Sequence, residues 1–285
     1  MFRSFRYPIV FSLILLCSLA AVVIPQTHSA RISFSTPEQI SEDFKNIPCK
    51  NEERLAAVRA LFIKMGAAES DLLSGQQKNV RNLFLTRRGA TEEKIIIGAH
   101  YDKAADGCGA IDNWSGIVTI AHLYRTLKDV QLRKTLVFAA FDKEEKGLVG
   151  AREMAEEISK EQLAQYCAMI NIDSTGLGAP QVLHNVSSPK LEELAEAVAK
   201  RMELPFGKAG VDSALADSAV FLERKIPAVT IHGLAGDFTK ILHTKDDKAV
   251  KINPESVYLT YRLALAVLVQ VDQTDCQAWR ETKKK

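Results

Sequence analysis

Histidine and acidic residues occur in short groups directly after apolar, β-branched runs of this 285-residue chain. The groups are His100-Tyr101-Asp102, Asp112-Asn113, Asp142 with Glu144-Glu145, Asp173, and His243. Carboxylates a few ångströms apart raise one another's pKa, and divalent cations relieve that repulsion. Imidazole nitrogens and carboxylate oxygens are also common zinc ligands. The pattern therefore predicts a hydrolase with two metal ions.

Different residue types in these groups suit different tasks. His100 is a candidate zinc ligand, and Asp102 is the candidate carboxylate that orients its other ring nitrogen. Asp112 has two oxygens and is placed to bridge two metals. Of the adjacent acids Glu144 and Glu145, one can coordinate metal. The other can then take a proton from the attacking water and pass it to the leaving amine.

Strand-like and helical patterns alternate along the chain, which predicts an α/β sandwich with a central mixed, largely parallel sheet flanked by helices. The strand-like runs are 80–86, 94–99, 135–141, 166–172 and 228–231, and the main helical segments are 55–65, 115–127, 148–158, 189–202 and 254–271. Ligands of such sheets bind outside the carboxyl ends of the strands. Three of the runs end at His100, Asp142 and Asp173, so we expect these side chains at one edge.

Composition predicts a globular chain of one domain or two. A single catalytic domain over residues 31–285, with its core at about 33–275, is the simplest division. The chain is 47% hydrophobic and 25% charged. Its 37 basic residues include two in the first thirty, Arg3 and Arg6, which leaves 35 against 35 acidic residues. That balance argues against nucleic acid or an anionic membrane as a partner. The sequence does not set the oligomeric state.

Residues 1–30 have the features of a signal peptide, so we expect a secreted or periplasmic protein. Arg3 and Arg6 precede an apolar stretch over 9–24, and the small residues Ser29-Ala30 follow. Cleavage near Ala30 would leave no stable membrane association. An uncleaved membrane anchor is the alternative, although the stretch is shorter than the roughly 20 apolar residues of a spanning helix.

Four cysteines follow the predicted signal peptide: Cys49, Cys108, Cys167 and Cys276. An even number in an oxidising compartment favours disulfides, and four cysteines allow three connectivities. Cys49 and Cys276 flank the predicted core, so this pair is the preferred one, with buried free thiols as the alternative. Cys108 lies in a Gly-rich turn and is not expected to bind zinc.

Five motifs in this order and spacing resemble the co-catalytic zinc aminopeptidase family (peptidase family M twenty-eight), over about 80–271. They are His-Tyr-Asp at 100–102, Gly-Ala-Ile-Asp-Asn-Trp-Ser-Gly at 109–116, Phe-Asp-Lys-Glu-Glu-Lys-Gly-Leu-Val-Gly-Ala at 141–151, Asn-Ile-Asp-Ser-Thr-Gly at 171–176, and His-Thr-Lys-Asp-Asp at 243–247. Bacterial leucyl aminopeptidases and glutaminyl cyclases are related to it. The resemblance implies a zinc exopeptidase-like fold and two zinc ions per chain.

The resemblance also implies a role for each matched residue. One zinc would be held by His100, Asp112 and Asp173, and the other by Asp112, Glu145 and His243. Glu144 would be the general base and acid, and Asp102 would support His100. A cis peptide is expected after Asp112.

Some positions depart from the family pattern or are expected to have no metal role. Ala219 replaces a histidine of the segment at 216–221, where Asp217 is a candidate pocket residue. Leu242 precedes His243 where some members have a tyrosine, which leaves the oxyanion donor open. Asp142, Asp246 and Asp247 are expected to be structural, and His122, His184 and His232 are not expected to bind metal.

The predicted function is that of a secreted aminopeptidase, which hydrolyses the N-terminal peptide bond of a peptide substrate. Two alternatives are a glutaminyl-peptide cyclotransferase with one zinc and a catalytically inactive peptidase-like binding domain. The inactive alternative is disfavoured because every ligand position and the general-base position are filled. Metal analysis and a pyroglutamate assay would distinguish the three. The preferred N-terminal residue and the native metal are not set by the sequence.

Overall fold

An eight-stranded mixed sheet forms the centre of the computed structural model, which describes residues 32–75, 79–211 and 215–280. The strand order is β1-β2-β4-β3-β5-β8-β6-β7. The strands are β1 (Leu72–Ser74), β2 (Leu83–Arg87), β3 (Lys94–His100), β4 (Thr135–Phe141), β5 (Tyr166–Ile172), β6 (Gln181–Leu183), β7 (Gly207–Ala209) and β8 (Ala228–His232). The central strands β4, β3, β5 and β8 run parallel, whereas β2 and β6 are antiparallel to β4 and β8. This arrangement confirms the predicted sheet.

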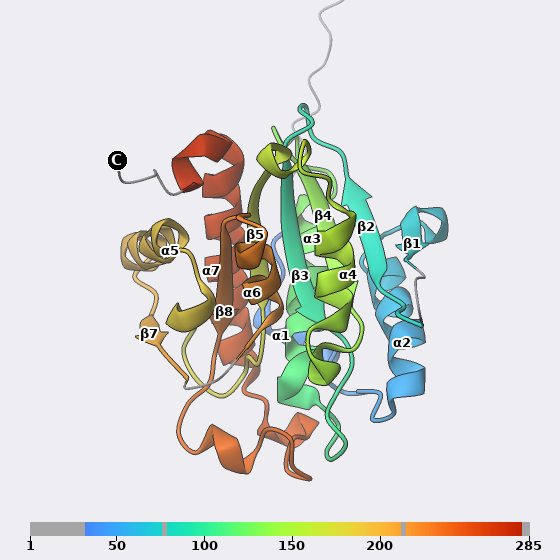
Figure 1. Cartoon of the computed structure of the whole chain (residues 1–285). Helices are drawn as coiled ribbons and strands as arrows, with labels where there is room; N and C mark the ends of the chain where they lie inside the picture. Colours follow the sequence, from blue (N-terminus) through green and yellow to red (C-terminus); the bar gives the residue numbers. More distant parts are fainter. Residues whose placement is uncertain (1–31, 76–78, 212–214, 281–285) are drawn as a thin grey trace, which may run out of the picture. The chain divides into compact units, whose positions relative to one another are not determined.

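Helices cover both faces of this sheet (Figure 1). The α-helices are α1 (Pro37–Glu42), α2 (Asn51–Lys64), α3 (Ser115–Leu127), α4 (Val149–Glu157), α5 (Pro189–Arg201), α6 (Asp217–Glu223) and α7 (Pro254–Gln273). In Figure 1, α4 and α6 lie in front of the sheet, while α3 and α7 lie behind it. The helices α1, α2 and α5 pack against α3 or α7. The result is the predicted three-layer sandwich.

The central strand β3 is buried on both faces, which explains its continuous apolar run. Ile95, Ile97 and Ala99 join the core on the side of α3 and α7, whereas Ile96 joins the core beneath α4 and α6. A Cβ atom at Gly98 would lie 2.6 Å from the Phe141 ring, so no larger residue fits there. The tight packing fixes the strand that ends at His100.

Elements of only three residues escaped the sequence-based prediction. Strands β1, β6 and β7 are this short, and three residues carry too little periodicity to be recognised. They widen the sheet at its two edges, away from the strands that carry the predicted ligands.

The predicted Cys49–Cys276 disulfide is wrong. Cys49 is bonded to Cys108, and Cys167 is bonded to Cys276. Cys49 lies just before α2, which contacts the turn that contains Cys108, whereas the segment after α7 returns to β5, which contains Cys167. The position of Cys49 and Cys276 near the two ends of the core was therefore a poor guide to their pairing.

The predicted signal peptide, residues 1–30, lies outside the described residues. Residues 32–280 fall within a single compact unit. Among the helices of the described ranges, none has the length and apolar character needed to span a bilayer.

Candidate metal centre

The carboxyl ends of three neighbouring parallel strands bring several of the predicted ligands to one edge of the sheet. His100 ends β3, Glu144 and Glu145 form a short 3-10 turn after β4, and Asp173 directly follows β5. The other two come from connections: Asp112 lies in the irregular turn before α3, and His243 follows β8. All of these predicted ligands and the predicted base come together in space.

The carboxylate of Asp112 lies between two histidines. Its Oδ1 atom is 3.1 Å from Nε2 of His100, and its Oδ2 atom is 3.0 Å from Nε2 of His243. Asp173 lies on the His100 side, with 3.6 Å between Oδ1 and Nε2. Glu145 lies on the His243 side, with 3.2 Å between Oε2 and Nε2. The two oxygens of Asp112 thus face two separate sets of ligand atoms.

These residues fit zinc by type and by distance. Two groups each offer nitrogen and oxygen atoms within 4.8 Å of one another, namely His100, Glu144 and Asp173, and Asp112, Glu145 and His243. Oε1 of Glu145 is buried and has no hydrogen-bond partner among the described residues, as expected of an atom that faces a cation. Imidazole with carboxylate is a common zinc set. Glu144 is 4.0 Å from His100 Nε2, so distance alone does not separate it from the ligands.

Crowded acids perturb one another's protonation in this cluster. Burial, reinforced by neighbouring acids, raises the pKa of Glu144 to about 10 and that of Glu145 to about 7. Burial alone would lower the pKa of His100, but Glu144 and the surrounding carboxylates raise it well above its usual value. The hydrogen bond to Asp112 raises the pKa of His243 to about 9. Bound cations would favour the ionised acids and neutral imidazoles, so metal binding should release protons.

Asp102 holds more of the site than the sequence indicated. Nδ1 of His100 lies 3.2 Å from the backbone carbonyl oxygen of Asp102 and 3.5 Å from its carboxylate, so the backbone of Asp102 is the closer partner of the ring. The carboxylate of Asp102 also accepts the backbone N–H groups of Glu144 at 2.9 Å and Glu145 at 3.2 Å. One buried carboxylate therefore ties the end of β3 to the turn after β4.

Asp247 is a structural residue whose importance the sequence did not reveal. Its Oδ1 accepts the backbone N–H groups of Ala110 and Ile111 at 2.8 and 2.7 Å, and its Oδ2 accepts that of Asp112 at 3.2 Å. Asp247 is therefore structural, as expected, but it supports the turn at 110–112 and not only its own loop. The sequence signal for Asp247 was its place in the His-Thr-Lys-Asp-Asp motif.

The peptide bond after Asp112 is cis, as the family resemblance implied.

Non-glycine residues with left-handed backbone flank the cluster. Lys143, directly before Glu144, has φ 57°, and His243 itself has φ 59°. Such conformations cost energy and persist where the surrounding structure enforces them, often at functional sites. Local propensity alone would not place these side chains.

A cavity of about 300 Å³ adjoins the cluster. Its polar lining includes His100, Asp112, Glu144, Asp173 and His243. Its apolar lining consists of Leu183, Val211, Leu215, Leu234, Phe238 and Leu242. The cavity can hold a short peptide end with an apolar side chain against the polar cluster.

Other singled-out residues lie apart from the two ligand groups. Asp217 is fully buried, its carboxylate oxygens have no hydrogen-bond partner among the described residues, and burial raises its pKa to about 8. His232 lines the cavity, and burial lowers its pKa to about 4. Asp142 accepts the backbone N–H of Arg81. The ring of His122 is hydrogen-bonded to the carboxylate of Asp43, and that of His184 is hydrogen-bonded to the carboxylate of Glu192. None of these last three residues lines the cavity.

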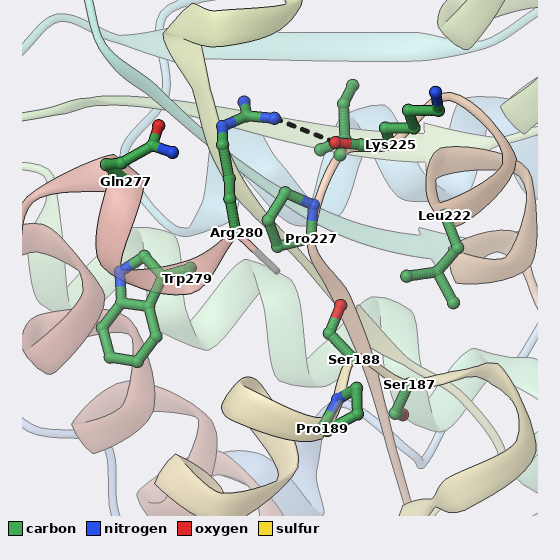
Figure 2. A pocket seen from close by; sticks show the side chains of 10 residues that line it. Ser187, Ser188, Pro189, Leu222, Lys225, Pro227, Gln277, Trp279 and Arg280 are labelled. Atoms are coloured by element: carbon green, nitrogen blue, oxygen red, sulfur yellow. Dashed lines mark hydrogen bonds between the residues drawn. The ribbon is translucent and has the colours of Figure 1, made fainter. Parts of the chain in front are cut away.

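A larger cavity of about 930 Å³, whose lining side chains Figure 2 shows, lies near the amino-terminal ends of β5 and β8. Pro227 directly precedes β8, and Arg280 donates hydrogen bonds to the carbonyls of Leu163 and Tyr166 at the start of β5. Figure 2 also shows the bond from Arg280 to the carbonyl of Lys225. The described residues that line this cavity include no histidine and no acid, the usual protein ligands of zinc besides cysteine.

A mixed sheet flanked by helices, with histidine and carboxylate groups at the carboxyl ends of its parallel strands, is typical of metallohydrolases with the zinc exopeptidase fold. The sequence profile of peptidase family M28 matches residues 82–268, and the chain belongs to this family. The match includes every predicted ligand. Members of the family are zinc-dependent peptidases.

Individual relatives are more distant. A probable leucine aminopeptidase of Arthroderma benhamiae is 28% identical over 207 residues, which is 63% of this chain and 57% of the relative. The chain therefore spans little more than half the length of that protein. The LapA aminopeptidase of Legionella pneumophila superposes with a TM-score of 0.69 at 21% identity, over 84% of this chain and 72% of LapA.

A glutaminyl cyclase from an Acidobacteriales bacterium has the same fold. It superposes with a TM-score of 0.71 at 18% identity, over 87% of this chain and 99% of the cyclase. At such identities the two superpositions establish the fold alone.

Proposed function

We propose that this protein is an exported aminopeptidase that binds two zinc ions and removes the N-terminal residue of peptides. The observation that carries the proposal is Asp112, whose two oxygens face His100 and His243 at 3.1 and 3.0 Å. A carboxylate in that position suits a pair of cations better than a single one. His100 and Asp173 complete one ligand set, and Glu145 and His243 complete the other.

Proton transfer falls to Glu144 in this proposal. When bound, zinc lowers the pKa of water from about 16 toward 7 and polarises the scissile carbonyl. Glu144 takes the proton of the attacking water and delivers it to the leaving amine. Its burial beside the cluster supports this role, because bound cations would keep Glu144 ionised while burial makes its carboxylate a stronger proton acceptor than an exposed one. The carboxylate of Asp102 positions Glu144 by accepting the backbone N–H of Glu144.

The adjoining cavity supports a preference for apolar N-terminal residues. Its apolar lining includes Leu183, Leu234 and Phe238, and its volume of about 300 Å³ accommodates a leucine, methionine or phenylalanine side chain. The free α-amine would lie toward the acids of the polar lining. A blocked amine would lose that interaction and add bulk there.

Two disulfides support export. Structural disulfides form and persist mainly in oxidising compartments, and the structure has the Cys49–Cys108 and Cys167–Cys276 bonds. Together with the signal-like residues 1–30, they favour a secreted or periplasmic location.

Metal analysis combined with a substrate panel tests the proposal. We expect two zinc ions per chain and hydrolysis of leucine, methionine and phenylalanine amides, with N-acetyl-leucine amide as the blocked control. Pyroglutamate formation from a glutaminyl peptide together with one zinc would favour the cyclase alternative. Release of C-terminal residues from an N-blocked peptide would also contradict the aminopeptidase assignment.

A further inference from the structure

We propose that residues 48–54 form a clamp that holds the loop at 101–110 and sets the affinity of the site for zinc, with Arg54 as its central positioning residue. This inference rests on the proposed zinc site. It concerns a segment outside the part of the chain that matches the family profile, 82–268. The loop joins His100 and Asp102 to the turn that presents Asp112.

Arg54 contacts both ends of that loop. It lies in α2 with no exposed surface. Its guanidinium donates to the carbonyl of Tyr101, next to His100, and to those of Cys108 and Gly109 at 2.8 and 3.2 Å. An arginine fork has five N–H donors in a fixed plane, so one side chain can hold several carbonyls at a set separation. Arg54 thereby fixes the distance between the two ends of the ligand-bearing loop.

Two further contacts from the same segment act on the loop. The side chain of Asn51 pairs with the backbone of Lys103, accepting its N–H at 2.9 Å and donating to its carbonyl at 3.0 Å. Cys49 is bonded covalently to Cys108. The clamp thus contacts the loop near its start, through Lys103, and near its end, through Cys108.

The other neighbours of Arg54 suit the same role. It donates to the carbonyl of Pro48 at 3.0 Å, and its guanidinium lies 5.2 Å from the centre of the Trp114 ring, two residues beyond Asp112. Burial lowers the pKa of Arg54 to about 10, and the carboxylates of Asp102 and Asp112 oppose that shift, so the guanidinium stays charged at neutral pH. A buried cation among acids lowers the repulsion that the loop must withstand. Arg54 acts through the loop backbone and not by direct contact with a ligand side chain.

The test is zinc affinity in Arg54→Lys, measured by competition with a chromogenic chelator on the purified protein. Lysine keeps the charge but loses the planar fork. We expect about tenfold weaker zinc binding, because loss of groups that support ligands costs 10- to 100-fold in metal affinity. The matched control is Arg59→Lys on the same helix, where Arg59 contacts Glu69, Leu72 and Ser74 instead of the loop. Its zinc affinity should stay within twofold of the wild type.

Thermal unfolding with and without zinc separates positioning from general stabilisation. If Arg54 positions the loop, zinc should raise the Tm of Arg54→Lys less than it raises that of the wild type. Equal zinc-induced shifts with unchanged affinity would overturn the proposal. If Arg54→Lys does not fold, Asn51→Ala removes an exposed side chain, and unchanged zinc affinity there would equally overturn it.

These measurements need no turnover, so they fail independently of the assigned activity. Zinc-loaded wild-type protein that cleaves no N-terminal residue would refute the proposed function and leave the clamp standing. Wild-type protein that binds no zinc would overturn both.

Discussion

The carboxylate of Asp247 accepts the backbone N–H of Asp112 at 3.2 Å. Asp247 lies in the same turn as His243, whose ring faces the Asp112 side chain from 3.0 Å. One turn after β8 therefore supplies both a candidate ligand and the support for the candidate bridge. The backbone at Asp112 departs from helical geometry, and Asp247 supplies a hydrogen-bond acceptor for the N–H of Asp112.

Asp247→Asn should lower the free energy of unfolding by about 2 kcal/mol and weaken zinc binding. An amide has one acceptor oxygen in place of two, and hydrogen bonds to charged groups contribute about 1.5–3 kcal/mol each. Denaturant unfolding and zinc analysis measure both effects. The adjacent, exposed Asp246→Asn is the control and should behave as the wild type.

Glu144→Gln should abolish turnover while zinc content stays near that of the wild type. Glutamine preserves the shape of the side chain but cannot carry the proton, and Glu144 is assigned no metal. Activity on leucine amide and zinc stoichiometry give the two readouts. Loss of zinc in this variant would mean that Glu144 is a ligand, as its place near His100 and Asp173 also allows.

Asp112→Ala should empty or scramble both ligand sets. The two oxygens of Asp112 face His100 and His243, so no other carboxylate occupies that position. Zinc stoichiometry after dialysis is the measurement. Asp106→Ala, in an exposed part of the preceding loop, should retain both ions. Full activity of Asp112→Ala with one ion bound would refute the bridging role.

Stability of the zinc-free protein should fall as the pH rises from about 6.5 to about 9. The folded-state pKa values of Glu145, Asp217 and His243 are raised to about 7, 8 and 9, so the folded state binds more protons than the unfolded state in this range. Unfolding free energy then decreases with pH. His232 acts oppositely only below about pH 6.5, because its pKa is lowered.

Zinc should reduce this pH dependence, because metal ions would displace the protons of the candidate ligands Glu145 and His243. Thermal unfolding across the pH range, with zinc and with a chelator, tests the expectation. A zinc-free protein that gains stability between pH 7 and 9 would contradict the protonation pattern of the cluster.

Peptide mapping under non-reducing conditions should recover Cys49 linked to Cys108 and Cys167 linked to Cys276. Reducing the first bond should weaken zinc binding, because it joins the clamp segment to the loop before Asp112. A peptide linking Cys49 to Cys276 would contradict this connectivity.

Sequence alone determined the sheet architecture and the members of the metal cluster. Apolar runs that end at His100, before Glu144 and at Asp173 place these side chains at one edge, because parallel strands share the direction of their carboxyl ends. Ordered motifs added Asp112 and His243. The strand ends follow from periodicity, whereas the two ligand sets follow from the resemblance of these motifs to a known family.

Only the tertiary structure decided how the cluster is supported. Arg54 and Asp247 lie far in sequence from the loop whose backbone they hold, and the Cys49–Cys108 bond joins residues 59 positions apart. Such contacts are made between side chains and irregular backbone, which carries no periodic signal in the sequence. Their partners are set by how α2 and the turn after β8 pack around the loop, and that packing exists only in the folded chain.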